Sequence, residues 1–253
     1  VDLAAIGMEV GRDPGITSRL LRLANSSHYG LEVPVVAPER AVAVIGVRSL
    51  QNIALQTSVV QRYEHLEEEL GCDLDEHWRH AALVADLCMD LGRDLGGRRA
   101  TGFAGVAFDE LYTLGLMHDV GKVVLLDSLR EEYHELLMEA RAQELAAGGA
   151  VDGELLRELE ERELGFTHAD VSELLCRQWQ FPPVLLAAIG GHHDHRDHGP
   201  EAGPATSLLS VCDGVAYALE NGTTVPSDMA GIAGFARVRL GMAPEAFGFW
   251  VER

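Results

Sequence analysis

Apolar residues recur every three or four positions through most of this 253-residue chain, which is the spacing of one face of an α-helix. In "DPGITSRLLRLANSS", Asp13 is a typical N-cap and Pro14 stands at the first helical position. The segment "PERAVAVIG" repeats this pattern, with Pro38 at its start and Gly46 at its predicted end, and Ser49 opens a longer helical segment. The first part of the chain is therefore predicted to be a group of helices.

The rest of the chain is also predicted to be helical. Residues 96–105 are rich in glycine and predict a loop, whereas Phe108 to Asp127 predict a single buried helix. Further helices are expected to start near Asp75, at Thr167, at Pro182–Pro183 and at Pro204. No segment alternates apolar and polar residues over a strand length with hairpin signals, so the fold class is predicted to be all-α.

The composition is that of a globular protein, with 47% hydrophobic and 24% charged residues and no apolar run of membrane-spanning length. Forty acidic and twenty basic residues give a net charge of −20. Such a surface repels phosphate backbones, so general nucleic-acid binding is not expected. The four cysteines are scattered without a CxxC pair, which is typical of the reducing cytoplasm, where we expect the protein to work.

The stretch "LMHDVGK" places His118 and Asp119 side by side in an otherwise apolar run. One interpretation is a buried hydrogen-bonded pair that fixes two helices, and the other is a metal site. The residues that could complete such a site are His80, His168, His192, His193, Asp213 and Glu76, which lies four residues before His80. Mixed nitrogen and oxygen ligands suit Fe or Mn, and also Zn, better than Ca or Mg, and they suffice for one or two ions per chain.

The order of these residues resembles the H…HD…D signature of the HD superfamily of metal-dependent phosphohydrolases. The signature positions are filled by His80, His118, Asp119 and Asp213. The "HDVGK" form is similar to the HD-GYP branch, which cleaves cyclic dinucleotides. The additional positions of that branch are matched in order by Glu76, His168, His192 and His193.

That resemblance implies divalent or mixed-valent metal ions and a nucleotide or cyclic dinucleotide as ligand. Asp119 would ligate or bridge the ions, and Lys122 would stabilise the charge of a phosphate. Lys122 is also open to a second interpretation, as the cation of the last turn of a helix. The stretch "HHDHRDHGP" contains no Gly-Tyr-Pro, so the likeness to HD-GYP does not extend to that motif.

Other parts of the chain resemble the HDOD domain, the HD-related output domain of bacterial signalling proteins. The similar stretches are "DPGITSRLLRLANSSHYG", "APERAVAVIGVRSLQNIAL" and "HADVSELLCRQWQFPPVLLAAIGGHH", the last with its Trp179-x-x-Pro182 spacing. The likeness covers essentially the whole of residues 1–253. It implies an N-terminal helical lobe, residues 1–70, and an HD-like helical bundle, residues 71–253, with the metal site. It also implies an output or adaptor role beside a kinase, a cyclase or a response regulator.

The sequence therefore predicts an HDOD-type signalling protein with a metal site, and the alternative is a metal-dependent phosphohydrolase or phosphodiesterase. In the second case Asp119 and Lys122 would be its catalytic residues. Asn25 is interpreted as architectural, because its side chain can satisfy backbone groups at a helix end. Four other histidines have no such pattern around them and are interpreted as surface or packing residues: His28, His65, His77 and His134.

Overall fold

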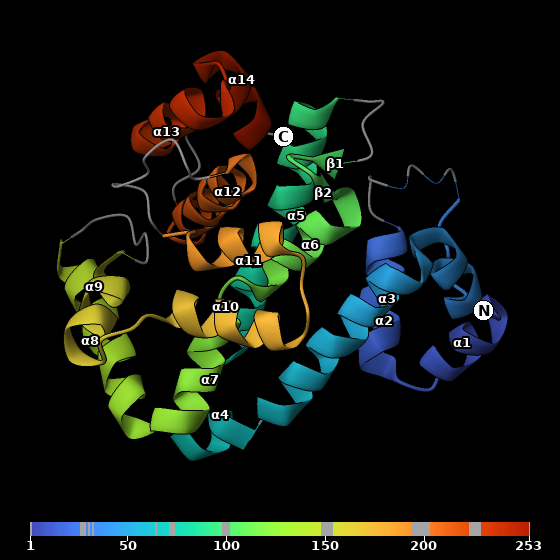
Figure 1. The fold of residues 1–253 in the computed structure, drawn as a ribbon, viewed down its shortest axis with the longest axis horizontal. Helices are drawn as coiled ribbons and strands as arrows, with labels where there is room; N and C mark the ends of the chain where they lie inside the picture. Colours follow the sequence, from blue (N-terminus) through green and yellow to red (C-terminus); the bar gives the residue numbers. More distant parts are fainter. Residues whose placement is uncertain are drawn as a thin grey trace. The chain divides into compact units, whose positions relative to one another are not determined.

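The computed structural model is all-α, as predicted, apart from one short β-hairpin (Figure 1). The structure describes residues 2–25, 29, 31, 33–63, 65–70, 74–97, 102–147, 154–193, 203–222 and 229–252. The chain divides into two compact units, residues 1–64 and residues 65–253. None of the described helices combines the length and the apolar character that crossing a bilayer requires.

In its described residues the first unit contains three helices, α1 (Leu3–Val10), α2 (Pro14–Ala24) and α3 (Pro38–Tyr63), and both α1 and α2 pack against α3. Asp13 caps α2 as predicted, since its Oδ1 accepts a hydrogen bond from the Ile16 amide at 3.0 Å. Within α3 two helical stretches meet at Gly46, whose φ of 82° and ψ of 168° are not helical, so the first stretch ends at Gly46 as predicted. A residue with a Cβ atom is strained at this positive φ, which is why glycine stands at the interruption.

Polar side chains of the first unit are satisfied by nearby backbone. The Asn25 side chain bonds the carbonyl oxygens of Leu21 and Val35 and accepts from the Val35 amide, so it ties the end of α2 to a later segment. Ser49 Oγ donates to the carbonyl of Ile45 at 2.8 Å. Asn25 is therefore architectural, as predicted. His28, which was predicted to be a surface or packing residue, lies outside the described residues.

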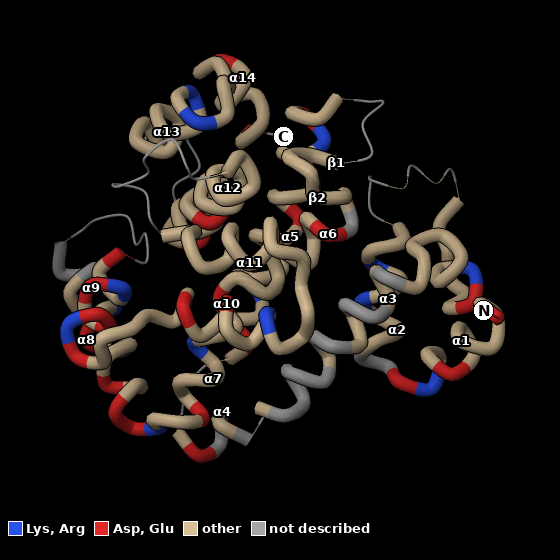
Figure 2. Tube along the Cα trace, in the orientation of Figure 1, with Lys and Arg blue, Asp and Glu red and all other residues tan. Residues whose placement is uncertain are grey.

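The second unit contains the remaining elements. Its first half comprises α4 (His65–Leu70), α5 (Leu74–Gly96), β1 (Gly102–Phe103), β2 (Val106–Ala107), α6 (Phe108–Met117), α7 (Val120–Leu129) and α8 (Glu131–Ala147). Its second half comprises α9 (Glu154–Glu163), α10 (His168–Gln178), α11 (Pro183–Gly190), α12 (Pro204–Glu220), α13 (Ala230–Leu240) and α14 (Pro244–Val251). Acidic residues recur along α8 and α9 (Figure 2).

Two predictions about this unit were wrong. The stretch 96–105 is not a loop throughout, because Gly102 and Phe103 pair with Ala107 and Val106 in an antiparallel hairpin. Phe108 to Asp127 is not one helix either, because α6 ends at Met117 and α7 begins at Val120. The apolar pattern continues through the break without Gly or Pro, so periodicity alone could not locate it.

Helices from distant parts of the sequence surround the centre of the second unit. α5 packs against α6 and α12, α7 packs against α10, and α11 contacts α6, α10 and α12. The apolar interior includes fully buried leucines and valines of α5, α6 and α12: Val84, Leu91, Leu111, Leu114, Leu208 and Val211. The break between α6 and α7 lies within this packed region and carries the His118–Asp119 pair.

Candidate metal centre

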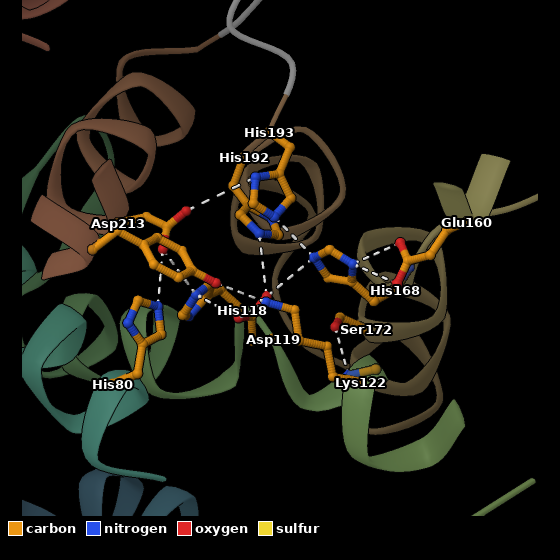
Figure 3. A network of polar contacts seen from close by, with 12 residues as sticks. His80, His118, Asp119, Lys122, Glu160, His168, Ser172, His192, His193 and Asp213 are labelled. Carbon is orange, nitrogen blue, oxygen red and sulfur yellow. Dashed lines mark hydrogen bonds and ion pairs between the residues drawn. The ribbon is translucent and has the colours of Figure 1, made fainter. Parts of the chain in front are cut away.

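The structure brings seven of the predicted ligands together inside the second unit (Figure 3). They are His80 from α5, His118 and Asp119 from the break before α7, His168 from α10, His192 and His193 after α11, and Asp213 from α12. Each is at most 5% exposed. Ionisable side chains are rarely buried without partners, so this concentration requires a specific arrangement.

The local structure places His168 at the first position of α10. Thr167 caps this helix, and its hydroxyl accepts from the Asp170 amide while the Asp170 carboxylate accepts from the Thr167 amide at 2.7 Å. This reciprocal capping fixes where the helix begins. The N-cap that was predicted at Thr167 is therefore present, and the residue after it points into the cluster (Figure 3).

A close approach of α7 to α10 explains the glycine of "HDVGK". The Gly121 amide donates to Ser172 Oγ at 2.8 Å, and a Cβ atom at position 121 would lie 2.0 Å from the carbonyl oxygen of His168. Only glycine permits this separation of the two backbones. The contact brings the start of α10, and with it His168, next to Asp119.

Two histidines are oriented by backbone carbonyl groups of the preceding turn. His118 Nδ1 lies 2.6 Å from the carbonyl oxygen of Gly115, and His192 Nδ1 lies 2.6 Å from that of Ile189. Because a carbonyl oxygen only accepts hydrogen bonds, each Nδ1 must carry the proton. In the neutral ring the Nε2 lone pair then points into the cluster and is available to bind a metal.

Two other histidines are oriented by carboxylates. His168 Nδ1 lies 2.7 Å from Glu160 Oε2, and His80 Nδ1 lies 2.8 Å from Glu220 Oε2. Here too, Nδ1 faces outward and Nε2 faces the cluster. A carboxylate behind a histidine is the usual support for a metal-binding imidazole, because it fixes the tautomer and raises the basicity of the ring.

Asp119 lies between the two sides of the cluster. Its Oδ1 is 3.2 Å from His168 Nε2 and 3.5 Å from His192 Nε2, whereas its Oδ2 is 3.4 Å from His118 Nε2. Asp213 Oδ1 is 3.0 Å from His80 Nε2. The carboxylate of Asp119 can therefore contribute one oxygen to each of two ions.

The donor atoms fit a metal. The buried atoms that have no hydrogen-bond partner within the described part of the chain include four ligand atoms of the cluster: His118 Nε2, His192 Nε2, Asp119 Oδ1 and Asp213 Oδ2. Leaving such groups without partners costs on the order of 1–3 kcal/mol each. Three sets of ligand atoms lie within 4.8 Å of one another: Asp119 with His168, His192 and His193; Asp119 with His80 and His118; and Asp213 with His118 and His192.

Charges within the cluster shift its protonation equilibria. Burial disfavours the charged form of His118, but the carboxylates of Asp119 and Asp213 outweigh this effect and raise its pKa to about 10. Burial lowers the pKa of His192, although Asp119 acts in the opposite direction. A metal must therefore displace a proton from His118, and its affinity is expected to fall as the pH is lowered.

Lys122 lies beside Asp119 in the first turn of α7. Its ammonium group donates to Asp119 Oδ2 at 2.5 Å and to the hydroxyl of Tyr217 at 3.0 Å, and the residue is 8% exposed. Because Lys122 is at the start of its helix, its interpretation as a cation of the last helical turn is wrong. The contact with Asp119 places a positive charge at the edge of the cluster.

Glu76 is the predicted ligand that the structure does not bring into the cluster. Its side chain is 47% exposed and pairs with Arg141 of α8 at 2.9 Å. The spacing of four residues puts Glu76 and His80 on one face of α5, but Glu76 lies one turn nearer the start of the helix, where it meets α8 instead.

Sequence reasoning missed three residues near the cluster. No recognisable sequence spacing links Glu160 or Glu220 to a predicted ligand. Glu160 precedes His168 by eight residues. His77, interpreted as a surface or packing residue, has a buried Nε2 without a hydrogen-bond partner in the described residues. Burial lowers its pKa to about 3, against the opposing influence of Asp119. Its position one turn before His80 was the available signal.

Fold and cluster together define a helical protein with a buried histidine–aspartate centre suited to metal ions. The HDOD domain family matches residues 1–195, and the chain belongs to this family. The MmoQ response regulator of Methylococcus capsulatus is 25% identical, with a TM-score of 0.55 and coverage of 99% of this chain and 90% of that one. An HDOD domain protein of unknown function from Geobacter sulfurreducens is 20% identical, with a TM-score of 0.63 and coverage of 99% and 81%.

An uncharacterised protein of Treponema pallidum is 25% identical over 201 residues. The alignment includes 79% of this chain but 35% of that relative, so this chain spans about a third of its length. The family match thus shows the HDOD family, and the solved structures share the helical fold.

Proposed function

We propose that this chain is an HDOD signalling module that binds one or two transition-metal ions in the cluster around Asp119. The observation that carries the proposal is the common orientation of four histidines, which hold Nδ1 outward and Nε2 toward Asp119 or Asp213. Iron or manganese, and also zinc, suits this mixed nitrogen and oxygen set.

The proposed output is a protein–protein signal. The similar protein of Methylococcus capsulatus is a response regulator, which supports this interpretation. Its partner would be a kinase, a cyclase or a regulator in the cytoplasm. The net charge of −20 opposes binding to nucleic acids in general.

Metal content is the first test of the proposal. The protein is purified without chelator and without added metal, and Fe, Mn and Zn are measured per chain by elemental analysis. We expect between one and two ions per chain. A well-folded sample that contains no metal and gains none on incubation with Fe²⁺, Mn²⁺ or Zn²⁺ would refute the proposal.

A second candidate function is metal-dependent hydrolysis of a phosphoester, such as a nucleotide or a cyclic dinucleotide. The observation that favours it is the buried Lys122 ammonium beside Asp119, where it can hold a phosphate oxygen. Metal ions in such a site supply an activated water and stabilise charge on the phosphate. Tyr217 fixes the Lys122 ammonium from the other side.

Chelation distinguishes the two functions. The protein is treated with a chelator, and its thermal unfolding and its turnover of nucleotides and cyclic dinucleotides are measured in the same sample. In the signalling function, metal removal lowers the melting temperature and no turnover precedes it. In the hydrolytic function, a measurable turnover is lost while the protein stays folded, and it returns when metal is restored.

A further inference from the structure

The carboxylates behind His168 and His80 differ in burial and in support. Glu160 is 0% exposed, and both of its oxygens lie within 2.9 Å of His168 Nδ1. By contrast, Glu220 is the last residue of α12, its side chain is 33% exposed, and it contacts His80 Nδ1 through a single oxygen at 2.8 Å. The same pair of a carboxylate and an imidazole therefore occurs once buried away from solvent and once partly exposed to it.

Further hydrogen bonds hold Glu160 in place. Its Oε2 accepts from the His168 backbone amide at 2.9 Å, and its Oε1 accepts from the hydroxyl of Tyr133 at 2.5 Å. Tyr133 is itself 0% exposed. The carboxylate is thus fixed by the backbone at the start of α10, by a buried phenol of α8 and by the imidazole (Figure 3 shows its contacts with His168).

These differences decide how strongly each carboxylate acts on its histidine. A charge interacts more strongly in the low-dielectric interior than at the surface, where water and salt screen it. A fixed carboxylate also costs no further ordering when the imidazole binds an ion. Glu160 therefore acts on His168 more strongly than Glu220 acts on His80.

We propose that Glu160 is a positioning residue for the metal ion on the His168 side of the centre, and that Glu220 has no comparable role on the His80 side. The inference rests on the proposed metal binding. Glu160 holds the His168 ring in one tautomer and orientation and increases the electron density at Nε2. Loss of Glu160 should weaken the binding of one ion and leave the binding of the other unchanged.

A matched pair of isosteric substitutions tests this inference. Metal-free wild type, Glu160→Gln and Glu220→Gln are titrated with Co²⁺, and binding is followed by visible absorption and by calorimetry. The glutamine side chain can still accept a hydrogen bond from Nδ1, so each variant removes the charge and keeps the shape. We expect a 10–100-fold weaker affinity for one ion in Glu160→Gln. In Glu220→Gln the change should stay within about fivefold, as for exposed ion pairs.

Tyr133→Phe separates positioning from a structural role. It removes a hydrogen bond from the same carboxylate but leaves its charge against His168. If Glu160 only supported the fold, both Tyr133→Phe and Glu160→Gln would lower the melting temperature of the metal-free protein and neither would alter the Co²⁺ affinity. We expect Tyr133→Phe to bind Co²⁺ within about fivefold of wild type. If Glu160→Gln does not fold, Glu160→Asp takes its place, with the charge kept but withdrawn from the ring, and the affinity should again fall for one ion.

The outcomes also separate this inference from the proposed function. Wild type that binds no Co²⁺ refutes the metal site and, with it, the role of Glu160. Wild type that binds Co²⁺ while both glutamine variants lose affinity equally, or while neither does, refutes the role of Glu160 alone. A loss confined to Glu160→Gln supports it.

Discussion

The two units of the chain differ in the buried polar groups of their described residues. In residues 1–64, the buried hydroxyls of Ser49 and Thr57 donate to carbonyl oxygens four residues earlier in their own helix. In residues 65–253, buried nitrogen and oxygen atoms of His118, His192 and Asp119 have no hydrogen-bond partner within the described residues. The first arrangement is complete by itself, whereas the second leaves ligand atoms facing one another, as the proposed metal site requires.

This difference distinguishes buried polar groups that stabilise the fold through their own hydrogen bonds from those whose atoms are left available to bind a ligand. A folded chain usually satisfies its buried polar atoms, and it can do so within a single helical turn. Unsatisfied atoms that converge from three separate segments of the chain are therefore evidence of a ligand.

Asp119→Asn should have the largest effect. The substitution removes the charge that both sides of the centre share and leaves the Lys122 ammonium buried without its ion pair. We expect loss of all bound metal and a decrease of about 3–5 kcal/mol in the free energy of unfolding. Elemental analysis and denaturant unfolding measure the two effects. Asp119→Asn with a wild-type metal content would show that Asp119 is not a ligand.

Gly121→Ala should perturb the centre without changing any of its ligands. The new methyl group would lie 2.0 Å from the carbonyl oxygen of His168, so α7 and α10 must move apart. Overpacking of this kind costs about 1–3 kcal/mol, and the metal affinity should fall as His168 moves away from Asp119. Ser172→Ala is the control, because it removes the hydrogen bond to the Gly121 amide without adding a methyl group between the helices.

His77→Gln should remove part of the acid sensitivity of the metal-free protein. Because folding lowers the pKa of His77 from 6.5 to about 3, the unfolded chain binds a proton between these values and the folded chain does not. This residue therefore destabilises the fold as the pH falls below about 6.5. Between pH 7.5 and 5 the loss is about 2 kcal/mol.

The acid sensitivity is measured by urea unfolding of wild type and His77→Gln at pH 7.5 and pH 5, with chelator present to keep both proteins free of metal. Wild type should lose about 2 kcal/mol more than His77→Gln over this interval. Equal losses would mean that the His77 imidazole takes up a proton as readily in the folded chain as in the unfolded one.

Ser49→Ala should have the smallest effect and no influence on metal. It removes one hydrogen bond to the Ile45 carbonyl, which contributes about 0.5–1.5 kcal/mol. Thermal unfolding and elemental analysis of the same sample measure both properties. A change in metal content would show that the first unit takes part in metal binding and would break the contrast between the units.

Local signals in the sequence predicted helix starts well. Asp13 and Thr167 were identified as N-caps because a side-chain oxygen before an apolar period is a local pattern. The break at His118–Asp119 was missed because the apolar period continues on both sides of it. The hairpin at residues 102–107 was missed because two-residue strands are too short to show alternation.

The ligands of the candidate metal centre could be predicted from the sequence, whereas the residues that support them could not. His118 and Asp119 were conspicuous because a polar pair interrupts an apolar run, and resemblance to a known order of residues added the others. Glu160 was not predicted, because α9 reads "ELLRELEERE" and one glutamate among five acidic residues carries no visible sign of burial. Its role depends on tertiary contacts with Tyr133 and His168, which no local pattern encodes.

The wide separation of the ligands in the sequence has a consequence for the newly made protein. His80 and Asp213 meet across 133 residues of chain. At a synthesis rate of about 5–20 residues per second, roughly 7 to 27 seconds pass between the translation of one and of the other. In the proposed function, the ligand set on the His80 side is complete only once Asp213 has been translated, so an ion can bind there only after most of the chain has been made.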